Sequence, residues 1–340
     1  MAFPPQSWSS SIPHGATGRV DGADYHGARG RSLFAADDCH AGVAIGLSGT
    51  SEIPVQIPMA VKHVPSRIHL LAAKEAPVIV VLQRKRAKLF HVVTINAATH
   101  EVVEGSWFRG VLHVMKCDVS FDGKYMVYMA VGQHAYTTWS GLCRLPWLKT
   151  LVDGKTIGIN WGGGHFASRD VLVTNGWQEP TGHAVSETDI PFKLVSGPLA
   201  YALSADSGMV EQGFEGDGFA RISDDAGPQE PFTDPEDPTV EVGDGGWAKR
   251  PSPAHPELQV HYLGYEHGEQ YVFSLPEFPG IVKGASWVTW DSIGTLWVAR
   301  PGVVEQFTLD DMPGGKPSFT LDVDRFEPPA RGEAISPAPP

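Results

Sequence analysis

The stretch Leu112 to Val131, LHVMKCDVSFDGKYMVYMAV, decides the fold. Its centre, Asp122-Gly123, has the residues of a tight turn, because Gly accepts the left-handed backbone conformation that such turns need. From Tyr125 onward, successive side chains alternate in a run rich in valine and aromatic residues, which is typical of a strand. The stretch therefore predicts two short strands joined by a hairpin turn.

The same pattern recurs along the chain. Near the C-terminus, Trp290-Asp291 leads into Gly294 and then into a second β-rich run. Turn markers of this kind recur about every 35–50 residues, which is typical of repeat architectures. They are Asp38, Glu75, Asp122, Ser168, Asp206, Glu257 and Asp291. The pattern predicts an all-β fold, a β-propeller of seven blades, with five or six blades as alternatives and a β-sandwich as the rival architecture.

Two hairpins resemble known propeller repeats. SFDGKYMVYMA, residues 120–130, resembles the S-x-D-G-K hairpin of TolB-like repeats, and WDSIGTLWVARPGVVEQF, residues 290–307, resembles the hairpin of the NHL and gluconolactonase-like propellers. In both groups the first strand lines the central channel. The resemblance implies the architecture and carries no activity.

Gluconolactonase-like propellers bind a divalent metal through acidic and amide side chains in the channel, so the resemblance makes a metal such as Ca²⁺ the cofactor to consider. Asp118, Asn160 and Asp170 lie near the expected inner strands, but strand alternation places some of them on the wrong face, so they do not make a complete ligand set. No metal ligand is therefore assigned.

The chain divides into three predicted parts. Residues 1–30, rich in Ser, Pro and Gly, predict an irregular N-terminal arm, residues 31–325 the propeller, and residues 326–340 a disordered tail. Within the propeller, residues 215–256 predict an acidic, proline-rich loop insertion. Its segment 215–244 holds ten acidic residues and one basic residue, a composition that cannot bury enough apolar surface to order itself. We expect that deleting residues 224–245 leaves folding intact.

Composition limits the partners. The 340 residues carry a formal charge of −13, which argues against a nucleic-acid partner because phosphates need a basic surface. Three cysteines without C-x-x-C spacing predict neither a disulfide framework nor a zinc site. The sequence has no run of about 18 apolar residues, so it predicts no membrane span. We expect a cytoplasmic monomer, or an extracellular one if a signal peptide was removed.

Five residues near the expected inner strands are candidate ligand contacts. Imidazoles and indoles before the marked turns, with a glycine that lets backbone approach a ligand, could form a polar and aromatic funnel. They are His113, Trp161, Gly163, His165 and Trp287. The alternative is that large side chains fill the narrow centre of the propeller and that the glycine marks a bend.

Motifs of catalysis are missing. The sequence has no G-x-S-x-G, no H-E-x-x-H and no phosphate-binding glycine loop, so no catalytic residue is assigned. We therefore expect a noncatalytic platform that binds a partner protein or a small ligand at one face of the disc. The alternative is a metal-dependent hydrolase or lyase acting on a lactone or carbohydrate at the channel, which would need acidic or histidine side chains converging on the axis.

Overall fold

The predicted hairpin forms at Asp122-Gly123, where Gly123 has a φ of 72°. It joins β6 (Asp118–Val119) to β7 (Tyr125–Val131) in a computed structural model of the chain. The structure describes residues 64–132, 138–155, 162–177, 190–196, 214–222, 246–262 and 271–330. All of them belong to one compact unit, Val61–Pro340.

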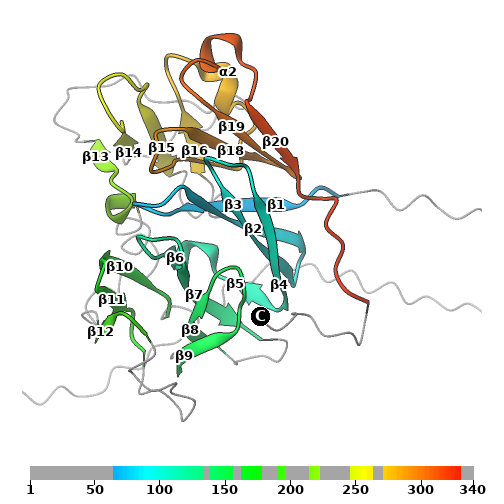
Figure 1. Cartoon of the computed structure of the whole chain (residues 1–340), viewed down its shortest axis with the longest axis vertical. Coiled ribbons are helices and arrows are strands. Elements are labelled where there is room, and N and C mark those ends of the chain that lie inside the picture. The colour runs from blue at the N-terminus through cyan, green and yellow to red at the C-terminus, as the bar shows by residue number, and fades with distance from the viewer. Residues whose placement is uncertain are drawn as a thin grey trace, which may run out of the picture. The chain divides into compact units, whose positions relative to one another are not determined.

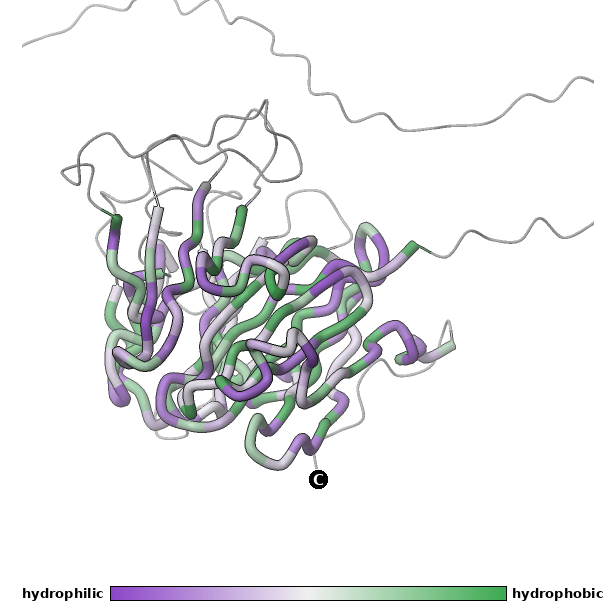
Figure 2. Tube along the Cα trace, turned by 90° about the horizontal axis from the view of Figure 1, so that it is seen from above, coloured by the Kyte–Doolittle hydropathy of each residue, from purple (hydrophilic) through white to green (hydrophobic). Residues whose placement is uncertain are grey.

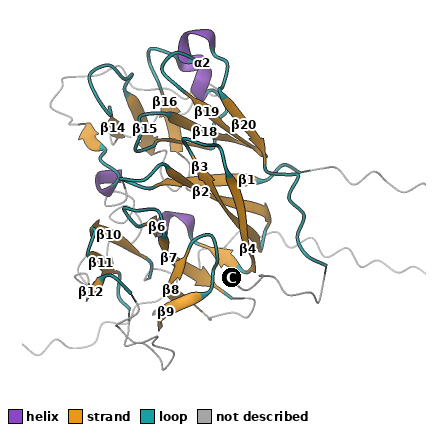
Figure 3. Cartoon of the chain, viewed as in Figure 1, coloured by secondary structure: helices purple, strands orange, loops and turns teal. Residues whose placement is uncertain are grey.

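The described residues form five sheets, each built from consecutive strands (Figure 1, Figure 3). The first blade contains β1 (Arg67–Ala72), β2 (Val78–Arg86), β3 (Leu89–Asn96) and β4 (Val102–Arg109). The second contains β5 (Val111–Leu112), β6, β7, β8 (Thr138–Arg144) and β9 (Thr150–Lys155). The third contains β10 (Gly164–Ser168), β11 (Val171–Thr174) and β12 (Lys193–Ser196). The fourth contains β13 (Ala220–Ile222), β14 (Gly246–Lys249), β15 (Leu258–Tyr262) and β16 (Tyr271–Ser274). The fifth contains β17 (Trp287–Trp290), β18 (Leu296–Arg300), β19 (Val303–Phe307) and β20 (Phe319–Asp322).

The described residues form an all-β propeller with five blades, so they do not support the prediction of seven blades and match the lowest of its alternatives. Glu75, Asp122, Ser168 and Asp291 do mark the hairpin between the first two long strands of a blade. Glu257 instead lies between the second and third strands of its blade. Asp38 and Asp206 lie outside the described residues. Turn chemistry occurs between any two strands of a blade, so the markers overcount the blades.

Among the described residues, helices are few and short. They are η1 (Val114–Lys116), α2 (Pro279–Val282) and η6 (Met312–Gly314), besides a single turn at residues 214–216. In the part of the chain that the structure describes, no helix has the length and apolar character needed to cross a membrane.

Strands in the middle of the blades are buried on both faces, because each blade packs between two neighbours. In β1, Leu70 belongs to a core shared with the fourth and fifth blades, whereas Leu71 faces the second blade. In β7, Met126 faces the first blade and Val127 faces the third. Figure 2 colours the trace by hydropathy, and green, hydrophobic stretches recur along the described part of the chain. Successive side chains of these strands point to opposite faces, and each face packs against an apolar neighbouring blade. Neither face is exposed to water.

The loop of the fifth-blade hairpin is held by one carboxylate. Asp291 Oδ1 accepts hydrogen bonds from the backbone amides of Ile293 and Thr295 at 3.0 and 2.8 Å. Its Oδ2 accepts from the Thr295 hydroxyl at 2.5 Å and from the indole nitrogen of Trp297 at 2.8 Å. The Trp-Asp dipeptide of the sequence is therefore a turn-building element.

Among the described residues, the first and last blades share no strand, and side-chain and backbone hydrogen bonds join them at a seam. Buried Gln83 donates from Nε2 to the Ser66 hydroxyl and to the Val323 carbonyl, each at 2.9 Å. The Gly302 amide donates to the Ser66 carbonyl at 2.9 Å. Ser66 Oγ also donates to the Asp324 carboxylate. The seam thus joins residues at the two ends of the propeller sequence.

The described parts of the predicted insertion contain two strands, and one residue of the predicted tail is buried. Residues 215–222 and 246–256 include β13 and β14, and residues 223–245 lie outside the described part. Phe326, at the start of the predicted tail, is 5% exposed and belongs to the core. Residues 1–63 and 331–340 also lie outside the described part.

Candidate functional site

Five charged or titratable side chains from four blades gather near the inner strands, and we call them the central cluster. They act on one another electrostatically, which shows that the fold brings them together. They are Lys74, Asp118, His165, Asp217 and Lys249. Since the inner strands of a propeller converge on its axis, residues far apart in sequence meet there.

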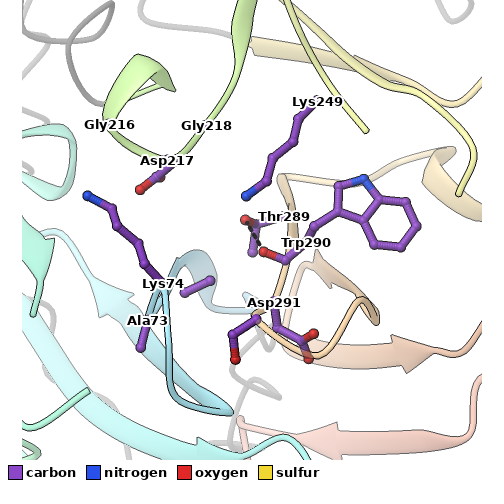
Figure 4. Close-up of a pocket in the computed structure, with 11 residues that line it drawn as sticks. Ala73, Lys74, Gly216, Asp217, Gly218, Lys249, Thr289, Trp290 and Asp291 are labelled. Carbon is purple, nitrogen blue, oxygen red and sulfur yellow. Dashed lines mark hydrogen bonds between the residues drawn. The ribbon is translucent and has the colours of Figure 1, made fainter. Parts of the chain in front are cut away.

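A cavity of about 250 Å³ lies among three members of this cluster. Lys74, Asp217 and Lys249 line it, together with Thr289 and the Trp290-Asp291 turn. Figure 4 shows the amino groups of Lys74 and Lys249 pointing toward the space in which the Asp217 carboxylate lies. The cavity is smaller than the roughly 300–1,000 Å³ of pockets for drug-sized ligands, so it suits a compact molecule.

Lys74 follows β1 and is held in place by its neighbours. Its Nζ donates to the Phe166 carbonyl at 3.3 Å and lies 4.8 Å from the centre of the Phe121 ring. A Cβ at Gly216 would come within 3.7 Å of this amino group. The glycine therefore leaves room beside the ammonium.

Lys249, the last residue of β14, approaches the cavity from the fourth blade. Its Nζ lies 5.5 Å from the centre of the Phe219 ring. Burial lowers the pKa of this amine, while the Asp217 carboxylate raises it. Loss of hydrating water disfavours the charged ammonium group, and the nearby carboxylate favours it.

Asp118 is fixed by backbone amides. Its Oδ2 accepts a hydrogen bond from Phe166 N at 2.7 Å and its Oδ1 from Val119 N at 2.8 Å. Burial raises the pKa of Asp118, whereas Lys74 and these amides lower it. The first of these bonds links the second blade to the third, so Asp118 positions two inner strands as well as contributing charge.

Asp217 has a different environment. Within the described residues, no group donates a hydrogen bond to its carboxylate and no salt bridge joins it to Lys74 or Lys249. Burial, reinforced by the charge of Asp118, raises the pKa of Asp217 to about 7, against the opposing effect of the two lysines. Its side chain is only half-buried, because it faces the cavity. Asp217 therefore exchanges a proton near neutral pH.

His165, in β10, completes the cluster. Burial lowers the pKa of its imidazole, and Asp118 raises it. Because burial is the larger effect, the ring is neutral at pH 7. A neutral imidazole beside a fixed carboxylate offers one donor and one acceptor to the site.

The structure separates the residues that the sequence grouped into one funnel. His165 joins the central cluster, while Trp287 lies in an aromatic group where its ring centre is 3.9 Å from that of His69. His113 directly precedes η1, beside residues of a second cavity. Trp161 lies outside the described residues.

Gly163 makes close contact with protein backbone. It has a φ of 74°, and a Cβ there would lie 2.1 Å from the Lys116 carbonyl oxygen. Its amide donates to Ser140 Oγ at 2.6 Å, and its carbonyl accepts from Trp177 Nε1 at 2.7 Å. These contacts hold the start of β10 against the second blade.

Sequence reasoning missed Lys74, Asp217 and Lys249. Lys74 adjoins the turn marker Glu75, so its place beside an inner strand was available from the pattern. Asp217 and Lys249 fall in the stretch that its acidity and prolines assigned to a loop. That assignment hid β14, which carries Lys249, and the turn before β13, which carries Asp217.

In the ranges that the structure describes, no three His, Cys, Asp or Glu side chains are grouped so that they could hold a metal ion. Comparison with known proteins gives no family model, no curated protein and no solved structure that matches the chain.

Proposed function

We propose that the central cluster binds a small anion that carries carboxylate or phosphate groups, and that the propeller serves as a noncatalytic ligand-binding platform. The observation that carries this proposal is the approach of Lys74 and Lys249 to one cavity from different blades, with no salt bridge neutralising either of them in the described part of the chain. When Asp217 is protonated, both ammonium groups are free to attract an anion that enters the cavity.

When its carboxyl group is protonated, Asp217 favours the binding of an anionic ligand. With a pKa near 7, it carries a proton during part of the time at neutral pH and can donate a hydrogen bond to a ligand oxygen. In its charged form it repels the same ligand. The cavity therefore favours an anion most when Asp217 is neutral.

Size restricts the ligand further. A space of about 250 Å³ accommodates inorganic phosphate or a short dicarboxylate, with water filling the remainder. The hydroxyl of Thr289 lines the same space and offers an additional polar contact.

Titration calorimetry with inorganic phosphate, oxalate and succinate tests the proposal. We expect at least one of the three to bind the wild-type protein, and Lys74→Gln or Lys249→Gln to weaken it at least about tenfold, as expected for a lost charge-assisted hydrogen bond. Lys283→Gln, at an exposed lysine outside the cavity, is the matched control. Absence of binding for all three anions, or equal affinities for all three variants, would reject the proposal.

A further inference from the structure

A second, larger cavity lies at the opposite end of β1. Arg67 and His69, near the start of this strand, line a space of about 630 Å³, whereas Ala72, at its end, lines the central-cluster cavity. Other walls come from the second blade, through Leu112 and Met115, and from Trp287 of the fifth blade. The two cavities share no residue, so they are separate sites.

The floor of the second cavity is aromatic. The rings of His69 and Trp287 have centres 3.9 Å apart and are tilted by 45°. Both residues are buried, and burial lowers the pKa of His69 to about 3, so the imidazole is neutral at pH 7. Phe90 lines the same space. Flat, uncharged rings of this kind favour an aromatic or other flat apolar ligand.

The mouth of the cavity carries two guanidinium groups. Arg67 and Arg84 are directly opposite in the register of β1 and β2, on the face that carries His69. Arg84 donates from Nη2 to the Ala87 carbonyl at 3.2 Å and lies 5.8 Å from the centre of the Phe90 ring. Across the described residues, neither arginine forms a salt bridge with a carboxylate.

Like charges directly opposite on paired strands destabilise a sheet, and a bound anion offsets this repulsion. The planar fork of a guanidinium group also matches the paired oxygens of a carboxylate, and two such groups lie side by side here. The cavity thus combines an apolar aromatic floor with a site for a carboxylate at its mouth.

We propose that this second cavity binds a small aromatic carboxylate, with its ring against His69, Trp287 and Phe90 and its carboxylate at Arg67 and Arg84. The proposal is independent of the proposed function, because it rests on different residues and a different cavity. The competing explanation is that the arginines only cover the apolar interface between the first two blades, in which case ligand charge has no effect.

The test uses benzoate, phenylacetate and 1-naphthoate, each compared with its neutral amide by titration calorimetry. We expect at least one carboxylate to bind, and its amide to bind at least tenfold more weakly. Arg67→Gln and Arg84→Gln should each weaken carboxylate binding about tenfold and leave amide binding unchanged. Arg86→Gln, on the same strand but outside the cavity, is the matched control and should keep the wild-type affinity.

Three outcomes would overturn the proposal: no binding of any of the three carboxylates, equal affinity for acid and amide, or equal loss in the Arg86→Gln control. The Lys74→Gln variant distinguishes binding in the second cavity from binding at the central cluster. If binding falls in this variant and not in the arginine variants, the aromatic acids occupy the central cluster instead, which would reject this proposal and support the proposed function.

Discussion

Three aspartates of this propeller show how surroundings decide the role of one side chain. Asp291 receives four hydrogen bonds from its own hairpin and builds the turn. Asp118 is fixed by two backbone amides between blades. Asp217 faces a cavity and shares its surroundings with two lysines. Sequence alone identifies all three as acidic residues near turns and cannot distinguish these roles, because Phe166 beside Asp118 and Lys74 near Asp217 come from other blades.

At Asp217, stability should depend on pH. Its folded-state pKa of about 7 exceeds the ordinary value of 3.8, so the folded protein binds the extra proton between these values. The stability that Asp217 gains from binding this proton is fully present below about pH 4 and is lost as pH rises through 7. Asp217→Asn mimics the neutral acid and does not titrate. Its free energy of unfolding relative to wild type should therefore rise between pH 5 and pH 8, by on the order of 2 kcal/mol after allowance for partial exposure.

Urea unfolding of both proteins at several pH values measures this difference. Glu215→Gln, at an exposed carboxylate two residues away, controls for loss of a nearby charge. A stability difference that does not change with pH would contradict the role given to Asp217.

Asp291→Asn should destabilise the fifth blade. The amide nitrogen that replaces Oδ2 would face two donors, Thr295 Oγ1 and Trp297 Nε1, and leave a buried indole without an acceptor. We expect a loss of about 2–3 kcal/mol in the free energy of unfolding, measured by urea denaturation. The exposed Asp310→Asn should change it by less than about 0.5 kcal/mol, and similar effects of the two substitutions would argue against the turn role of Asp291.

Among the elements, those built from local signals were predictable. The Asp-Gly hairpin is found before β7, and the β-rich run expected after Trp290-Asp291 is found as β18 and β19. Elements that depend on distant partners were not. β14 follows a proline-rich acidic stretch, and its local sequence does not predict a strand. Pairing with β13 and β15 supplies the hydrogen bonds that make it one. The same long-range pairing hid Lys249.

The start of β10 depends on a glycine at Gly163. Gly163→Ala would combine a left-handed backbone at φ 74° with a Cβ 2.1 Å from the Lys116 carbonyl oxygen. Because backbone must move to relieve this clash, we expect a loss of at least about 3 kcal/mol in unfolding free energy. Thermal and urea unfolding measure it.

Gly280→Ala offers the matched comparison. This glycine lies in α2, has no atom within 4 Å of a built Cβ, and should tolerate alanine or gain up to about 1 kcal/mol. Equal stability of the two variants would show that the contact between β10 and the second blade is not tight.

For the whole molecule, closure of the ring rests on polar side chains between the first and last blades. Gln83→Leu removes the donor to Ser66 and Val323, which leaves a buried carbonyl without its partner. We expect a loss of about 2 kcal/mol and faster hydrogen exchange at the amides of Gly302 and Val323, which lie at this seam.

Gln259→Leu is the control, since Gln259 bonds only to Glu257 of its own blade among the described residues. It should leave exchange at Gly302 and Val323 unchanged. If exchange at these amides is also unchanged in Gln83→Leu, the seam is held by apolar packing and not by the glutamine.

Because each blade is continuous in sequence and no strand is shared across the seam, the order of the blades along the chain is not required by the sheet pairing. Ser66 and Asp324 are hydrogen-bonded, so a short linker could join the chain near these two residues. A circularly permuted chain covering residues 64–330, opened between the fourth and fifth blades, would contain every strand pair that the structure describes. This propeller can thus acquire new chain ends, or receive an inserted domain there, without rebuilding any blade.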